Sequence, residues 1–164
     1  MSGAPQLSTR RAVQTGGVVA ALAAVLIMAW EGLVPHTYAD PVLGWRVPTA
    51  CWGHTGAGVI IGRRYTTAEC RAFLNEDIRT HAEGIARCIT VDVPPESMAA
   101  FVSFSFNAGV NAFCRSGIRR DLNAGNLRAA CDGLSRWVYS GGRRIQGLVN
   151  RRAAERALCL RGVT

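Results

Sequence analysis

The sequence lacks the cysteine and histidine spacings that are typical of zinc sites. None of its six cysteines forms a Cys-x-x-Cys pair or a cysteine-histidine cluster. The cysteines are Cys51, Cys70, Cys88, Cys114, Cys131 and Cys159. An even number outside metal motifs predicts three disulfides in an oxidising compartment, with the pairing left open. The alternative is that several are small buried apolar residues. No metal or organic cofactor is indicated.

The chain also lacks the length for a second independent domain and any recognisable motif for reading nucleic acid. Its 164 residues, 49% of them hydrophobic, can bury one sizeable core. Arginine supplies the positive charge behind a formal net charge of +8, which predicts attraction to an anionic nucleic acid, lipid surface or cell-wall polymer. Aromatic residues are not interleaved with the arginines, so we expect no nucleic-acid partner. A solvated basic face is the simpler interpretation.

Charge is absent from Ala12 to Trp30, a run of 19 residues that directly follows Arg10 and Arg11. That length is just enough to span a bilayer as a helix, and the two arginines should keep the N-terminus in the cytoplasm. Alanine and glycine dilute the large aliphatic residues, so the span is marginal and could leave the bilayer. A cleavable signal peptide and an ordinary buried helix are the two competing interpretations.

The rest of the chain reads as mostly helical with one small antiparallel sheet near its start. Glycine recurs among β-branched and aromatic residues from Val47 to Arg64, which predicts strands joined by tight turns. A capping box at Thr66 and Glu69 predicts the start of a helix. Further helices are expected at 94–108, where apolar residues on nearly all sides indicate burial, and near 127–137 and 146–160.

Three polar side chains in the first third of the chain could serve glycosidic hydrolysis. That reaction needs one carboxylic acid to protonate the leaving oxygen and a second polar group to place water. Glu31 follows the uncharged run, Asp40 lies nine residues later, and Thr49 precedes Cys51. A glutamate at a helix, an aspartate on the next loop and a hydroxyl on the first strand could face one another. Carboxylates alone are weak evidence, because most are solvated surface groups.

The residues around these three groups resemble the phage-type lysozymes, glycoside hydrolase family 24. The resemblance rests on Glu31-Gly32-Leu33, Tyr38-Ala39-Asp40, Thr49 with Gly53-His54-Thr55, and then, in the same order, Tyr65 to Cys70, Leu74 to Asp77, Phe106 to Gly109, Arg136-Trp137 with Tyr139, and Gly147 to Arg152. It covers about residues 31–162. With the uncharged segment in front, the whole chain resembles the signal-anchor-release endolysins, which stay inactive at the inner membrane until the anchor slips out.

The resemblance implies a role for each of six residues. Glu31 would be the general acid, while Asp40 and Thr49 would position the attacking water, with inversion at the sugar carbon. Arg151 matches an arginine that contacts the catalytic glutamate, and the other interpretation is a surface arginine. His54 and Asp77 match a stabilising pair. The family usually places its threonine six residues after the aspartate, where this chain has Arg46, so Thr49 matches only if three extra residues are accepted between Pro41 and Pro48.

The resemblance also implies an organisation and a location. We expect a signal-anchor segment at 1–30, with residues 12–30 in the inner membrane, and a lysozyme-like α+β muramidase domain at 31–164. The enzyme would face the periplasm, be released into it as a monomer, and lyse the host by cleaving the β-1,4 bond between N-acetylmuramic acid and N-acetylglucosamine of peptidoglycan. No cysteine precedes Cys51, so an anchor thiol is not available to exchange a disulfide. Activation should therefore require the released segment to repack before Glu31 is in place.

Two alternatives stay open at this point. A lytic transglycosylase acts on the same bond with one glutamate, but it needs no partners to position water, so Asp40 and Thr49 favour hydrolysis. A cationic protein that disrupts membranes would use the marginal anchor and the arginines, and it would work without Glu31.

Overall fold

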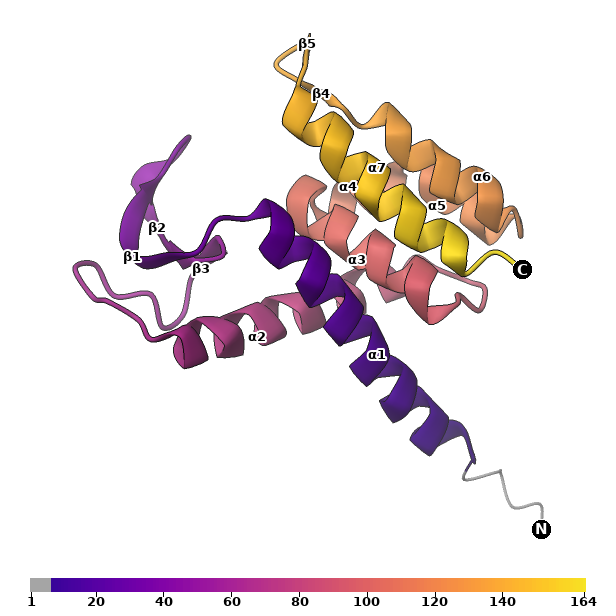
Figure 1. Ribbon diagram of the computed structural model, residues 1–164, viewed down its shortest axis with the longest axis horizontal. Helices are drawn as coiled ribbons and strands as arrows, with labels where there is room; N and C mark the ends of the chain where they lie inside the picture. Colours follow the sequence, from indigo (N-terminus) through magenta and orange to yellow (C-terminus); the bar gives the residue numbers. More distant parts are fainter. Residues whose placement is uncertain (1–6) are drawn as a thin grey trace.

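A computed structural model describes residues 7–164, with side chains described from Gly16 onward. Helix α3 lies in the middle of the molecule and packs against α1, α2 and α7, while the three-stranded sheet lies at one side and α4 to α6 at the other (Figure 1). The elements in chain order are α1 (Leu7–Trp30), β1 (Val34–Asp40), β2 (Gly44–Cys51), β3 (His54–Thr55), α2 (Thr67–Ala86), α3 (Pro95–Ala108), α4 (Val110–Arg115), α5 (Gly117–Asn123), α6 (Leu127–Gly133), the 3-10 helix η1 (Leu134–Arg136), β4 (Tyr139–Ser140), β5 (Arg143–Arg144) and α7 (Gln146–Arg161). The mostly helical fold with a small antiparallel sheet confirms the predicted class.

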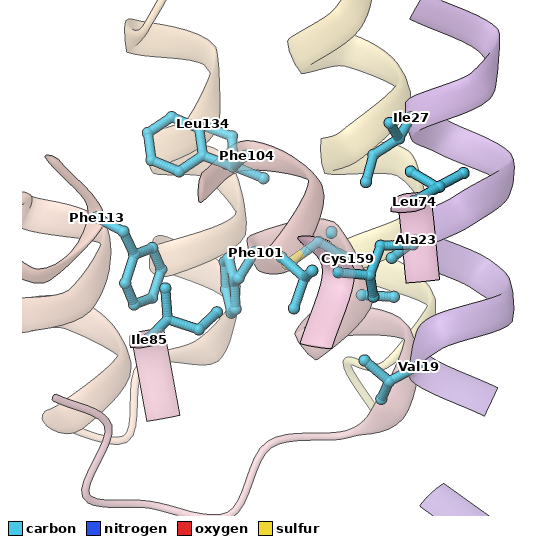
Figure 2. Close-up of a cluster of buried hydrophobic side chains, with 14 of the residues drawn as sticks. Val19, Ala23, Ile27, Leu74, Ile85, Phe101, Phe104, Phe113, Leu134 and Cys159 are labelled. Atoms are coloured by element: carbon cyan, nitrogen blue, oxygen red, sulfur yellow. The ribbon is translucent and has the colours of Figure 1, made fainter. Parts of the chain in front are cut away.

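Helix α3 is the core helix that its sequence predicted. A proline opens it in the first turn, and it ends at Gly109, whose φ of +99° suits glycine. Seven consecutive residues, 99–105, are buried, so the helix has almost no solvent-facing side over that stretch. Phe101 and Phe104 both pack toward Phe113, and Figure 2 shows them among side chains from the surrounding helices. Neighbouring helices can therefore be positioned against one another through α3.

Helix α1 contributes one stripe of side chains to this core. Val19, Ala23 and Ile27 recur every fourth residue and are all buried, whereas Val18 and Val25 on the other sides are exposed. Figure 2 shows the three buried side chains pointing from α1 toward the cluster that contains Leu74. Within residues 7–164, no helix combines the length and the apolar character that crossing a membrane requires. The predicted span at 12–30 includes residues 12–15, whose side chains lie outside the described part.

The three-stranded sheet begins and ends earlier than the sequence predicted. β1 pairs antiparallel with β2, and β2 with β3. The strand expected around Ile60 and Ile61 is wrong, because both residues lie in a loop. The Tyr65 hydroxyl accepts a hydrogen bond from the Ile60 backbone N–H (2.7 Å) and donates one to the Gly58 carbonyl (2.8 Å), which fixes the loop. A second, two-stranded ladder of β4 and β5 was not predicted.

The remaining predictions from local sequence can be compared with the structure directly. The capping box is confirmed: the Thr66 hydroxyl accepts from the Glu69 backbone N–H and the Glu69 carboxylate accepts from the Thr66 backbone N–H. The helix expected near 127–137 ends at Gly133 and continues only as η1. The three expected disulfides join Cys51 to Cys70, Cys88 to Cys114 and Cys131 to Cys159.

Candidate active site

Glu31 is positioned by the end of α1. Its backbone N–H donates to the Ile27 carbonyl at 2.8 Å, so the last turn of the helix holds the residue. Its side chain is 30% exposed, which leaves the carboxyl accessible from one side. Because Ile27 is itself fully buried, the place of Glu31 depends on the packing of α1 against the core.

Arg151 brings α7 to this carboxylate. Its Nη1 donates to Glu31 Oε1 at 2.6 Å, and the arginine side chain is only 4% exposed. Such a charge-assisted hydrogen bond in a partly buried place is stronger than an exposed ion pair. The alternative of a surface arginine is therefore wrong.

Asp40 and Thr49 lie on the first two strands. Asp40 ends β1, and its Oδ1 accepts from the backbone N–H groups of Val42 and Leu43 at 2.8 and 2.7 Å. Thr49 is buried on β2, and its hydroxyl donates to the Val47 carbonyl at 3.1 Å. Both side chains are thus oriented by neighbouring backbone.

The register of β1 and β2 accounts for the three extra residues before Thr49. Ala39 pairs with Pro48, but the next residue, Asp40, pairs with Gly44. Residues 45–47 are therefore looped out as a bulge between two adjacent positions of β1. Thr49, beyond this bulge, lies opposite Tyr38, which is two residues before Asp40.

Tyr38 is a candidate site residue to which the sequence reasoning gave no role of its own. Thr49 lies opposite it in the antiparallel pair, so the two side chains share one face of the sheet. Burial raises the pKa of the Tyr38 hydroxyl, and the negative charges of Glu31 and Asp40 raise it further. Tyr38 is thus within electrostatic reach of both carboxylates. Its position two residues before Asp40 was the one available signal.

His54 and Asp77 join the sheet to α2. His54 Nδ1 lies 2.9 Å from each carboxylate oxygen of Asp77, and the imidazole stacks on Phe73 with ring centroids 4.1 Å apart. Burial raises the pKa of Asp77, although the hydrogen bond from His54 opposes this. His54 is buried, and its hydrogen-bond partners in the described region are Asp77 and the Ala57 carbonyl rather than Glu31.

The structure also has a surface hollow of about 500 Å³, and Glu31 is not among the residues that line it. It is lined by η1, β4 and α7 residues, among them Arg136, Tyr139 and Val149. Val149 is two residues from Arg151, so it projects from nearly the opposite side of α7. The hollow is therefore separate from Glu31.

The chain is similar to a known protein family, to a named relative over almost its whole length, and to solved structures. The phage lysozyme family model matches residues 28–155. The SAR-endolysin of Enterobacteria phage PA-2 is 40% identical over 164 residues, covering 96% of this chain and 98% of the relative. The muramidase domain of SpmX from Asticcacaulis excentricus is 28% identical, with a TM-score of 0.76 over 84% of this chain and 94% of that one.

A third protein similar to this chain has been solved in two forms. The active form of the P1 phage endolysin Lyz has a TM-score of 0.76 at 29% identity, covering 87% of this chain and 85% of that one. Its secreted inactive form has a TM-score of 0.51 and covers 66% of this chain and 78% of that one. The likeness is thus closer to the active form. The chain belongs to the phage lysozyme family and is a lysozyme-type glycoside hydrolase.

Proposed function

We propose that Glu31 is the general acid of peptidoglycan hydrolysis and that Asp40 and Thr49 position the attacking water. Glu31 would protonate the glycosidic oxygen while water attacks the sugar carbon from the opposite side, giving inversion. The hydrogen bond from Arg151 carries this proposal, because it holds the Glu31 carboxyl at the end of α1 with one side accessible. Thr49 lies opposite Tyr38, which is two residues before Asp40. Arg151 would hold the Glu31 carboxyl in position, and the pair of His54 and Asp77 would fix the sheet against α2.

Clearing of permeabilised cells tests this assignment. The whole chain with Glu31→Gln should clear outer-membrane-permeabilised cells at least about a hundredfold more slowly, since general acid catalysis contributes at least that much. Glu83→Gln, an exposed glutamate of α2, is the matched control and should leave the rate unchanged. Undiminished clearing by folded Glu31→Gln would overturn the proposal and favour a cationic membrane-disrupting protein.

Mass spectrometry of the released fragments separates hydrolysis from transglycosylation. Hydrolysis gives fragments with reducing ends, because a water molecule is added across the bond. A lytic transglycosylase would give anhydro ends. Asp40→Asn and Thr49→Ala should each slow release without changing the fragment masses, because both groups would act on water.

The N-terminal segment is proposed to anchor the enzyme in the inner membrane before release into the periplasm, where it would act as a monomer. Residues 1–30 would then be the signal anchor and 31–164 the muramidase domain. Support comes from the uncharged run at 12–30 behind two arginines, and from alanines and glycines that weaken its insertion. The relative from phage PA-2, whose name denotes signal-anchor release, matches along almost the whole chain.

Release would activate the enzyme through packing. The stripe at Val19, Ala23 and Ile27 is buried against the core. The same side chains cannot contact lipid in a bilayer and the protein core at the same time. Glu31 follows this helix, so it would reach Arg151 only after α1 has docked. Replacing the small residues of 12–30 by leucine should hold the segment in the bilayer and abolish lysis. Full activity of the membrane-held variant would contradict activation by docking.

A further inference from the structure

A second glutamate lies behind the arginine that contacts Glu31. Glu155 follows Arg151 by one turn of α7 and is fully buried. Its Oε1 accepts from Arg151 Nε (3.1 Å) and from the Ser103 hydroxyl (2.8 Å), and its Oε2 accepts from Arg152 Nη1 (2.6 Å). A buried carboxylate is costly unless it is paired and hydrogen-bonded, and this one is both.

The guanidinium of Arg151 is held at three separate atoms. Nε donates to Glu155, Nη2 donates to the Ser103 carbonyl at 3.2 Å, and Nη1 donates to Glu31. Because the guanidinium is planar and rigid, fixing Nε and Nη2 fixes the direction in which Nη1 points. Two of the three contacts therefore set the geometry of the third.

We infer that Glu155 is a positioning residue, which acts through Arg151 to hold the Glu31 carboxyl where it meets the glycosidic oxygen. This inference rests on the proposed role of Glu31 as the acid. The hydrogen-bond partners of the Glu155 carboxylate in the described region are Ser103, Arg151 and Arg152, and its full burial leaves no surface for substrate, so its effect on the reaction runs through the guanidinium. A displacement of about 1 Å at the acid can cost about a hundredfold in rate, which makes such a support consequential.

The two oxygens of Glu155 serve different purposes. Arg152, which binds Oε2, donates through Nε to the Trp137 carbonyl at 3.0 Å, through Nη2 to Asn107, and lies over the Phe104 ring. These contacts join α7 to η1 and α3, and none of them involves Glu31. The Oε2 side is structural, whereas the Oε1 side faces the proposed acid through Arg151.

The wild type and three variants of the whole chain test the inference through a double-mutant cycle in kcat. The set is wild type, Glu155→Gln, Arg151→Gln and the double variant, assayed on soluble glycan fragments over a range of concentrations. Glu155→Gln should lower kcat about tenfold to a hundredfold with little change in KM. In the Arg151→Gln background the same substitution should lower kcat no further. A purely structural role would instead lower the unfolding free energy and leave the kcat of the folded enzyme unchanged. Losses that multiply would mean that Glu155 affects kcat by a route other than Arg151.

Arg156→Gln is the matched control. It also removes an α7 arginine from a carboxylate pair, since Arg156 Nε lies 2.7 Å from Asp132 Oδ1, but that pair shares no hydrogen bond with Glu31 or Arg151 in the described region. Its kcat should equal that of the wild type. A folded Glu155→Gln variant with normal kcat, or multiplying losses in the cycle, would overturn the inference.

Ser103→Ala keeps the test decisive if Glu155→Gln does not fold. It removes one donor to Glu155 and leaves both arginines in place. We expect a loss of kcat of several-fold that vanishes in the Arg151→Gln background, and an unchanged kcat would overturn the inference. The activity of Glu31→Gln separates the proposed role of Glu31 as the acid from the inferred role of Glu155 as its positioning residue. If Glu31→Gln is inactive while the cycle shows no coupling, only the role of Glu155 fails.

Discussion

Truncating Ile27 to alanine tests whether α1 is part of the folded enzyme. Ile27 is fully buried, and it precedes Glu31 by one helical turn. Removing a buried isoleucine side chain costs about 2–5 kcal/mol of unfolding free energy, through lost apolar transfer and the cavity that remains. Domains of this size are stable by only about 5–15 kcal/mol in total. Ile27→Ala should therefore remove a large share of the stability.

Val25→Ala provides the matched control in the same helix. Val25 is 64% exposed, so its truncation removes little buried surface. Alanine also favours helix slightly over a β-branched residue, so the expected change is within about 0.5 kcal/mol of zero. The two variants differ mainly in the face of α1 that they alter.

Urea unfolding and cell clearing together read out the result. The purified Ile27→Ala variant should unfold at clearly lower urea and clear cells more slowly, because Glu31 loses the helix that holds it. Val25→Ala should match the wild type in both assays. Equal unfolding midpoints for both variants and the wild type would refute the packing of α1 in the core.

Three further expectations concern pH, disulfides and the membrane. Burial lowers the pKa of His81 below 6.5, so as the pH falls the unfolded chain binds a proton on this imidazole before the folded chain does. The unfolding free energy should therefore rise as the pH is raised toward 6.5, by at most about 1.4 kcal/mol per pH unit. His81→Gln should flatten this rise, as measured by urea unfolding at a series of pH values. Replacing Cys131 and Cys159 together by alanine opens a link across 28 residues and should cost about 3.5 kcal/mol on the chain-entropy model, measured by thermal unfolding. Ala23→Leu should strengthen insertion and overpack the core by about 1–3 kcal/mol, so fractionation should find more enzyme in membranes.

Local sequence predicted the helices better than the sheet. The capping box at Thr66 and the apolar residues of 94–108 act within one helix, so nearby residues suffice to recognise them. β1 was missed because Pro35 interrupts it and its pairing with β2 is a non-local contact. Ile60 was wrongly placed in a strand because its β-branched side chain favours one, whereas the Tyr65 hydroxyl holds its backbone in a loop.

The candidate site likewise contains residues that can be recognised from the sequence and residues whose place depends on the fold. Glu31, Asp40 and Thr49 stand in a recognisable order, so the family resemblance finds them without knowledge of the fold. Glu155 looks like any acid in an arginine-rich helix, because its burial is created by α3 and α7 together. Tyr38 gains its place only through the register of β1 and β2. The resemblance also pointed to Arg151, His54 and Asp77, whose contacts the structure shows. The residues that sequence reasoning missed are those whose place depends on the packing and register of the fold.

The small residues of α1 suit both of the environments proposed for it. Ala23 on α1 is fully buried, as are Ala99 and Ala100 on α3, and the two helices pack together. Small side chains at such an interface let helix backbones approach closely, which larger residues would prevent. The same alanines contribute little to membrane insertion, so they would keep the proposed anchored state marginal. A more apolar segment would bind lipid better and fit α3 worse, and both effects would oppose release. One composition thus sets the balance between the two states.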